Sequence, residues 1–188
     1  DAISKGYVDN LEIGGRNLMA VSELAINRGY KAIHPLTPNV TISGYEVKIS
    51  SVLNDALGGV IYRDSLKSTS LYLSFRTNLT LPVIKALITY VGDADDIIRT
   101  DTFEFKPTYS GLYEAKVTLR NLDFKELHTA FFYRGVNPDL TYPIDFIQPL
   151  IINSNTKGGW TPAPEDVQAE IDAAVVKATY WSIKSSAP

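Results

Sequence analysis

The sequence contains no cysteine, which excludes disulfide bridges, thiolate zinc sites and cysteine nucleophiles. It contains only two histidines, His34 and His128, which lie far apart in the chain. A histidine-based metal site or acid–base site would therefore have to be assembled from lone residues. We interpret each histidine as an ordinary surface or packed side chain.

The chain also lacks an excess of positive charge and any long apolar run. Its 18 Lys and Arg against 21 Asp and Glu give a formal net charge of -3, which argues against nucleic acid as a partner. No segment approaches the roughly 20 apolar residues that span a bilayer, and the first residues lack the pattern of a signal peptide. We expect no membrane insertion.

Common catalytic motifs are missing as well. The sequence has no G-x-S-x-G elbow, no G-x-x-x-x-G-K-[ST] phosphate loop and no G-x-G-x-x-G fingerprint. Its 188 residues, 45% of them hydrophobic, are enough for one domain with a short appendage. Because the chain starts at Asp1 and stops at Pro188 without a polar tail, we expect it to be a piece of a longer protein.

What the sequence has instead is alternation of apolar and polar residues between about residues 40 and 152. In Leu71–Arg76, for example, Leu71, Leu73 and Phe75 are predicted to face a core, and Tyr72, Ser74 and Arg76 to face outward. This pattern predicts about eight strands and an all-β fold, a β-sandwich of jelly-roll type. The predicted strands cover residues 45–50, 59–63, 71–76, 83–91, 102–106, 113–119, 127–134 and 144–152.

The two ends of the chain predict short helical connectors. Residues 1–12 place Ile3, Tyr7 and Leu11 four apart before a glycine pair, as in the last turns of an incoming helix. Residues 165–188 predict a second helix, in which apolar residues recur at gaps of 4, 3, 4 and 3, the spacing of a coiled-coil seam. A single amphipathic helix docked on the body is the alternative. The β module is then residues 13–164. The apolar positions of this helix are Val167, Ile171, Ala174, Ala178 and Trp181.

Two groups of side chains are candidates for chemistry. Three carboxylates in Asp93–Asp96 are able to bind a hard cation, so a structural calcium ion is considered beside the simpler interpretation of a solvated hairpin tip. A glycosidase would need two neighbouring carboxylates, and Glu46, Glu104 and Glu114 supply only a weak signal for such a pair. No other cofactor is expected.

Aromatic residues are more suggestive, since they make up 11% of the chain. A flat ring matches the apolar face of a sugar, and neighbouring polar side chains take up its hydroxyls. The competing explanation is that tyrosine packs well in strands. Several tyrosines fall at outward or strand-end positions, namely Tyr62, Tyr72, Tyr90 and Tyr109.

Two stretches of sequence resemble a known family. The first is Ile13–Leu18, which contains Gly-Arg-Asn-Leu, and the second is Trp160–Asp166, which reads Trp-Thr-Pro-Ala-Pro-Glu-Asp. They resemble the opening and closing motifs of carbohydrate-binding modules in bacteriophage and prophage tail, baseplate and tail-fibre proteins. The strand Leu71–Arg76 resembles the central strand of these modules. One departure is Leu150–Asn155, which stands where the family usually has a leucine-glutamate-lysine-glycine stretch.

The resemblance implies a non-catalytic, galactose-binding-like jelly-roll module that recognises glycans of the bacterial surface. It also implies a phage virion location, and other tail proteins as partners. We expect a homo-oligomer. The motifs themselves are predicted to be structural, with Arg16 and Asn17 pinning the first strand and Trp160 closing the sandwich.

The predicted sugar site follows from outward-pointing positions alone. It combines Tyr72 and Arg76 on one strand with three residues from expected neighbouring strands. Two other functions are kept open, a tail spacer or assembly domain without sugar binding and a glycan depolymerase. The site residues are Tyr62, Tyr72, Arg76, Glu114 and Arg134.

Overall fold

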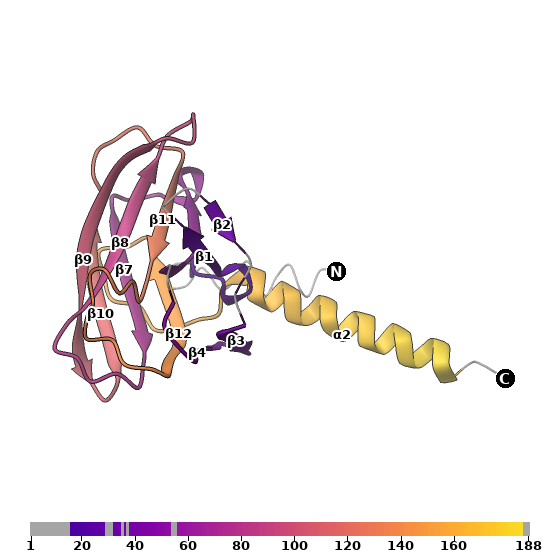
Figure 1. Ribbon diagram of the computed structural model, residues 1–188. Helices are drawn as coiled ribbons and strands as arrows, with labels where there is room; N and C mark the ends of the chain where they lie inside the picture. The colour runs from indigo at the N-terminus through magenta and orange to yellow at the C-terminus, as the bar shows by residue number, and fades with distance from the viewer. Residues whose placement is uncertain (1–15, 29–31, 35, 37, 54–55, 186–188) are drawn as a thin grey trace.

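Antiparallel strands followed by one helix make up the computed structural model, which describes residues 16–28, 32–34, 36, 38–53 and 56–185 (Figure 1). Of two short 3-10 helices, η1 (Val21–Glu23) precedes the strands and η2 (Arg63–Ser65) lies within their run, and α2 (Pro164–Ser185) follows the last strand. The strands are β1 (Ala25–Arg28), β2 (Ala32–His34), β3 (Val40–Ser43), β4 (Glu46–Ile49), β5 (Ala56–Gly58), β6 (Val60–Tyr62), β7 (Ser70–Arg76), β8 (Ile84–Val91), β9 (Ile97–Tyr109), β10 (Leu112–Thr118), β11 (Glu126–Ala130) and β12 (Ile144–Ile152).

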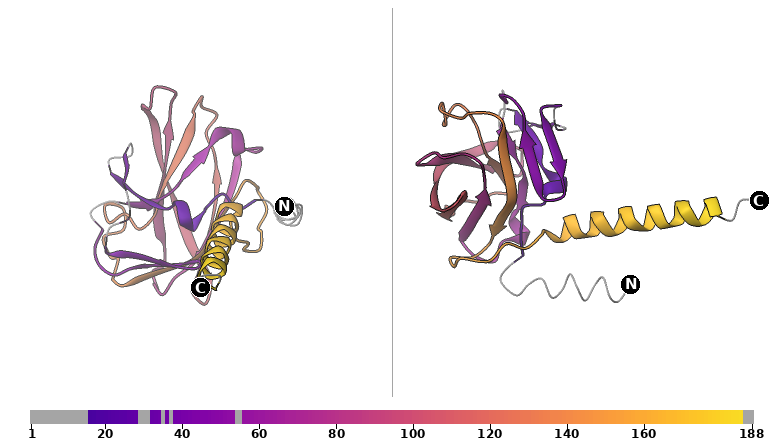
Figure 2. Two further views of the ribbon diagram at one scale, coloured as in Figure 1. Left: turned by 90° about the vertical axis from the view of Figure 1, so that its right-hand side faces the viewer. Right: turned by 90° about the horizontal axis from the view of Figure 1, so that it is seen from below.

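The strands form two sheets. Nine of them hydrogen-bond in the order β3-β4-β12-β7-β10-β9-β8-β11-β6, and β2-β1-β5 form a small second sheet. All strand pairs are antiparallel, and the large sheet curls around the core (Figure 2). The prediction of an all-β body with a C-terminal helix is therefore confirmed. Each predicted strand overlaps an observed one, whereas β1, β2, β3 and β5 were not predicted.

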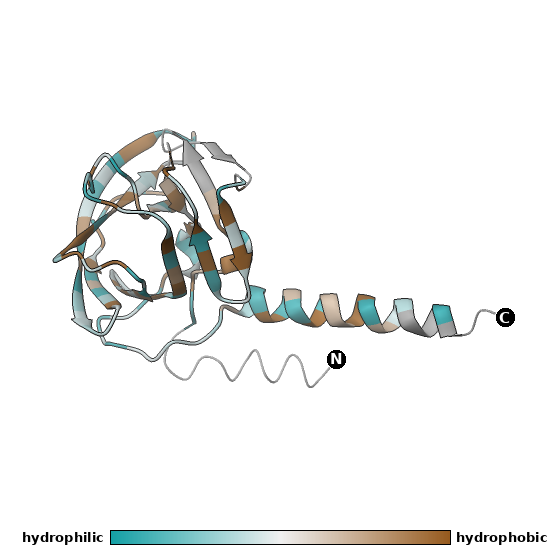
Figure 3. Cartoon of the chain, turned by 60° about the horizontal axis from the view of Figure 1, so that its bottom comes forward, coloured by the Kyte–Doolittle hydropathy of each residue, from teal (hydrophilic) through white to brown (hydrophobic). Residues whose placement is uncertain are grey.

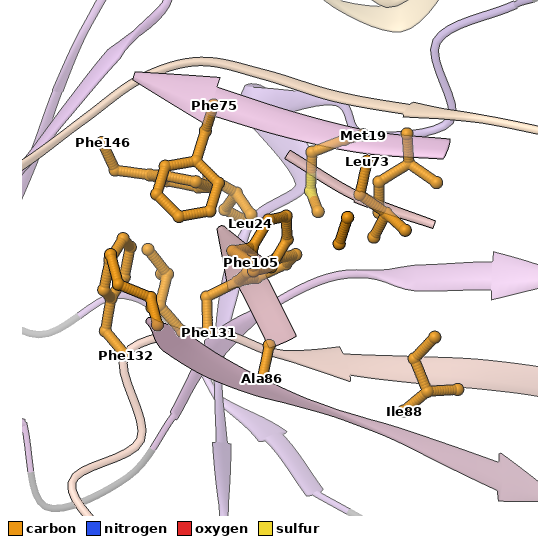
Figure 4. Packing of buried hydrophobic residues seen from close by; sticks show 14 of the residues in the cluster. Met19, Leu24, Leu73, Phe75, Ala86, Ile88, Phe105, Phe131, Phe132 and Phe146 are labelled. Carbon is orange, nitrogen blue, oxygen red and sulfur yellow. The ribbon is translucent and has the colours of Figure 1, made fainter. Parts of the chain in front are cut away.

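The core lies inside the curl of the large sheet. Leu71, Leu73 and Phe75 of β7 are each 1% exposed and face this core, as the alternation predicts. The ring of Phe75 contacts the rings of Phe105 and Phe146 edge to face, with centroids 4.7 and 5.1 Å apart (Figure 4). Such rings combine large apolar area with a fixed geometry, so they hold the strands of the sheet in register. We call the opposite side of β7 and β10 the outer face.

A bulge divides β12 into two parts. The register with β7 shifts between Ile147 and Leu150, and Gln148 has a φ of 51°. Before the bulge Phe146 belongs to the core, whereas after it Leu150 lies with Tyr72 in a separate cluster on the outer face. An extra residue in one strand reverses which residues face the core.

The opening and closing motifs meet in space. Arg16 forms an ion pair with Glu165, and Asp166 accepts hydrogen bonds from the backbone N–H groups of Val21 and Ser22 at 2.9 and 2.8 Å. Asn17, 2% exposed, bonds to the bulge of β12 and to the closing motif. A structural role for both motifs is thus confirmed, although Asn17 ties down β12 rather than the first strand.

Helix α2 begins at Pro164, which suits a first helical position because its missing N–H has no helical partner there. The start of the helix is docked, with Val167 in its first turn and the preceding Ala163 buried. Residues 172–180 are exposed, and the helix projects from the β body (Figure 1). Within the described residues, no helix has the length and apolar character needed to span a bilayer. The predicted connector at residues 1–12 lies outside the described residues.

Candidate functional site

A cleft of about 280 Å³ lies on the outer face of β7 and β10. The strands supply its floor, the turn between β9 and β10 supplies one wall, and the segment before α2 supplies the other. The lining residues are Tyr72, Ser74, Arg76, Tyr109, Leu112, Glu114, Gln148, Lys157, Gly158, Gly159 and Trp160.

The register of the strands explains why these residues meet. Ser74 of β7 pairs with Glu114 of β10, and Arg76 pairs with Leu112, so their outward side chains share one surface. Tyr109 pairs with Leu112 across the turn. This turn requires Gly111, because its φ is 75° and an added Cβ would lie 2.8 Å from the carbonyl oxygen of Thr77.

Tyr109 presents an aromatic ring at the cleft, since 57% of the residue is exposed. The guanidinium carbon of Arg76 lies 5.6 Å from the centroid of this ring, and the ammonium of Lys157 lies 6.0 Å from it. Both distances fit a cation–π contact. The cleft therefore combines an exposed flat ring with two cationic hydrogen-bond donors.

Glu114 is the carboxylate among the residues that line the cleft, and its side chain is 15% exposed. It forms an ion pair with Lys157 and accepts hydrogen bonds from the hydroxyls of Tyr72 and Thr108. Burial alone would raise the pKa of Glu114, but the hydrogen bonds from Lys157, Tyr72 and Thr108 hold this pKa below its usual value. Glu114 is thus ionised at neutral pH and fixes the position of Lys157.

Tyr72 lies under the cleft rather than at its surface. It is 3% exposed, because Leu150, Ile152 and Trp160 pack over it. Burial, followed by the hydrogen bond to Glu114, raises the pKa of its hydroxyl, so the hydroxyl remains a donor. The expectation that Tyr72 points away from the core is correct, but its use as a free sugar platform is wrong because its ring is covered.

Trp160 is half-buried at the end of the cleft. Its indole N–H donates to the carbonyl oxygen of Pro149 at 3.3 Å, and its ring meets that of Tyr45 edge to face at 5.0 Å. These contacts hold the closing motif against the bulge of β12. The sequence interpretation assigned Trp160 a purely structural role, whereas the structure also places it in the lining.

Among the predicted site residues, the structure brings Tyr72, Arg76 and Glu114 together. Tyr62 and Arg134 do not line the cleft. They were expected on strands next to β7, but Tyr62 belongs to β6, and Arg134 follows β11, at the other end of the large sheet. Tyr62 is 61% exposed and Arg134 is exposed.

Gln148 and Lys157 line the cleft and were missed by the sequence reasoning. Gln148 reaches it through the bulge, which follows no alternation, and Lys157 comes from an irregular segment without a period. The only available signal was the run of glycines and polar residues before Trp160, which indicates a loop without saying which face it covers.

The other candidates for chemistry form no such arrangement. Asp95 lies in the turn between β8 and β9 and pairs with Lys125 at 3.0 Å. Among the described residues, no group of three or more His, Asp or Glu side chains is placed to hold a metal ion. His128 is 4% exposed and lies 2.9 Å from Glu126, which confirms a packed histidine. The side chain of His34 lies outside the described part of the structure.

Tyr90 also differs from its expected outward position. It is 1% exposed, and its hydroxyl accepts a hydrogen bond from the backbone N–H of Arg120 at 3.0 Å. Its ring packs edge to face against Phe124. Tyr90 is therefore a core residue with a satisfied hydroxyl.

A second cavity of about 590 Å³ lies between η2 and the segment after β10. Its arginines are engaged within the protein: Arg63 donates to the carbonyl oxygen of Leu122 at 2.9 Å and pairs with Asp123. Arg120 pairs with Asp101. The one aromatic residue in its lining, Phe124, is 8% exposed. This cavity is larger, but it offers neither an exposed ring nor an unpaired arginine.

Comparison with protein-family models and with curated proteins found no match for this chain.

Proposed function

We propose that this chain is a non-catalytic glycan-binding module and that the cleft on the outer face of β7 and β10 is its binding site. The observation that carries the proposal is the exposed ring of Tyr109 beside Arg76 and Lys157. A sugar ring stacks its apolar face on an aromatic ring and directs its hydroxyls to polar neighbours. The cleft contains both parts of that arrangement.

The neighbouring polar groups are held in place before a ligand arrives. Lys157 is fixed by Glu114, and Glu114 is fixed by Tyr72 and Thr108. Ser74 and Gln148 add neutral hydrogen-bonding groups at the floor. Groups that are already ordered lose less conformational entropy on binding, so a shallow site can still select a ligand.

The proposal extends to the fold and the biological setting. We propose a jelly-roll sandwich that belongs to a phage tail, baseplate or tail-fibre protein and aids adsorption to bacterial surface polysaccharide. Support comes from the resemblance of the terminal motifs, together with the ion pair of Arg16 with Glu165 that joins them. Weak sites on a homo-oligomer gain avidity, by about 10²- to 10⁴-fold for linked sites.

A spacer or assembly domain without sugar binding is the second candidate. It is favoured by α2, which projects from the body and exposes Val175, Val176 and Tyr180 by 59, 69 and 58%. The two functions differ in what they require of the cleft. Only glycan binding requires Tyr109 to be accessible.

A glycan array of neutral and acidic bacterial polysaccharides tests the proposal, with the whole chain as the probe. We expect binding that Tyr109→Ala abolishes and that Tyr62→Ala leaves unchanged. These two tyrosines are matched controls, since they are 57 and 61% exposed and only Tyr109 lines the cleft. Absence of binding to every glycan, or equal loss in both variants, would refute the cleft as a glycan site.

A further inference from the structure

Building on the proposed glycan function, we infer that the cleft selects an acidic sugar, whose carboxylate is bound by the guanidinium of Arg76 with the ammonium of Lys157 beside it. Nothing in the terminal motifs specifies the charge of the ligand. The inference comes from the balance of charges within the cleft and from which of them are already paired.

The single carboxylate of the lining is already in use. One oxygen of Glu114 accepts from Tyr72 and lies against Lys157, while the other accepts from Thr108 at 2.8 Å. A carboxylate has about four acceptor positions, so Glu114 has little capacity left for sugar hydroxyls. It neutralises Lys157 and leaves Arg76 as the uncompensated charge of the cleft.

Arg76 differs from the other arginines with described partners. Arg16, Arg63, Arg99 and Arg120 each pair with a carboxylate of this chain. Among the described residues, Arg76 has no carboxylate within ion-pair distance. Its protein hydrogen bond is a long one, 3.4 Å, to the carbonyl oxygen of Ser110. Most of the five N–H groups of its guanidinium are therefore available for a ligand.

Arg76 and Lys157 both lie near the ring of Tyr109. Arg76 and Lys157 lie 5.6 and 6.0 Å from the centroid of that ring, so an anion bound to them lies next to the stacking surface. A carboxylate attached to a sugar ring meets this geometry, because a planar guanidinium binds a carboxylate through two parallel hydrogen bonds. A neutral sugar would leave the charge of Arg76 without a partner.

The test compares three acidic polysaccharides, polygalacturonate, polyglucuronate and polymannuronate, with their carboxyl-reduced forms, which have the same linkages and no charge. Binding of the whole chain is measured by isothermal titration calorimetry. We expect at least one acidic polymer to bind with a Kd at least tenfold lower than that of its reduced form. We expect this ratio to fall toward one in Arg76→Gln and to fall in part in Arg76→Lys, which retains the charge without the planar donors.

Arg134→Gln is the matched control, since Arg134 is an exposed arginine that does not line the cleft. It should retain the preference for the acidic polymer. Thermal unfolding of each variant establishes that it is folded. Equal affinity for acidic and reduced polymers, or an acid preference that survives Arg76→Gln, would overturn the inference.

The failure of the inference and the failure of the proposed function give different results. If Tyr109→Ala abolishes binding to a neutral glycan and no acidic polymer is preferred, the glycan site remains and its acid selectivity is wrong. If no glycan of either kind binds, both are wrong.

Discussion

The side-chain oxygen of Asn17 accepts a hydrogen bond from the backbone N–H of Ile151 at 3.0 Å, joining residues 134 positions apart in the chain. The amide nitrogen of Asn17 donates to the carbonyl oxygens of Pro149 and Thr161 at 3.0 and 2.9 Å. Asn17 thus satisfies backbone groups of β12 at Pro149 and Ile151 and of the closing motif at Thr161. The same bulge carries Gln148 into the cleft, so a buried amide supports the shape of the proposed site.

We expect Asn17→Ala to lower the free energy of unfolding by about 3 kcal/mol, because buried backbone groups lose their partners. Urea denaturation followed by circular dichroism measures this change. Asn121→Ala is the control, since Asn121 is exposed, and its effect should stay within about 0.5 kcal/mol. Equal effects of the two substitutions would mean that the Asn17 contacts do not stabilise the fold.

Gly58 is predicted to tolerate no side chain. A Cβ at this position would lie 1.7 Å from the backbone oxygen of Thr129, which belongs to β11 and cannot move without breaking the sheet. We expect Gly58→Ala to cost more than about 3 kcal/mol or to prevent folding. Gly159→Ala is the matched control because an added Cβ there meets nothing within 4 Å. If the Gly58→Ala protein unfolds at the same temperature as the wild type, the close approach of β5 and β11 is contradicted.

Glu114 predicts a pH dependence of stability. Its pKa in the folded protein lies below the usual value of 4.5, so the unfolded chain binds more protons in this range and stability rises with pH there. The stabilisation is therefore complete above about pH 4.5 and is lost as the pH falls through the folded pKa. We expect Glu114→Gln to cost about 1 kcal/mol at pH 7, a modest value because Lys157 is 54% exposed and water screens the pair.

Urea unfolding from pH 7 down to pH 3 measures this dependence. The difference between wild type and Glu114→Gln should shrink as the solution becomes more acidic. Glu104→Gln is the control, since Glu104 is exposed on β9 and has no ion pair among the described residues. A difference that grows on acidification would reverse the sign of the argument.

The alternation of side chains predicted most of the large sheet because its longer strands show a period of two. The sequence of β7 alternates over its seven residues, and its core-facing side chains were predicted correctly, although Tyr72 and Ser74 on the other face are buried as well. β5 has three residues, all buried, and shows no period at all. β2 has three residues and β1 has four, which is at most two alternations. Short strands are stabilised by their neighbours, and that information is not local in sequence.

The candidate site was predicted in part for the same reason. The alternation of side chains along β7 and β10 predicted that Arg76 and Glu114 lie on one face, and the strand register confirms this prediction. Alternation does not show which strands are neighbours, so the prediction that Tyr62 lies beside Arg76 and Glu114 was wrong. Alternation also does not show what covers a face, so it did not predict that Tyr72 is buried beneath Trp160. Lys157 lies in a segment without regular structure, where no pattern exists to be read.

Helix α2 predicts self-association. Beyond its docked first turn, residues 172–180 are exposed, and an isolated helix of this length is marginal in water unless it packs against a partner. Apolar and polar residues are both distributed along it, as the colouring of Figure 3 shows. Ala174 and Ala178 lie on the predicted coiled-coil seam, where small residues allow close approach of a second helix. We therefore expect the chain to form homo-oligomers through this seam.

A negative charge on the seam of α2 should prevent this association, whereas a negative charge on another face of the helix should not. We expect Ala174→Glu to shift the protein to monomers in sedimentation velocity, because the glutamate would be buried without a partner. Ala173→Glu, one residue away on another face of the same helix, should leave the oligomer intact. Both helices carry added negative charge, so only the position of the charge distinguishes them. If the wild-type chain sediments as a monomer at micromolar concentration, α2 does not associate through this seam. The gain in avidity that we propose for linked sites would then be absent.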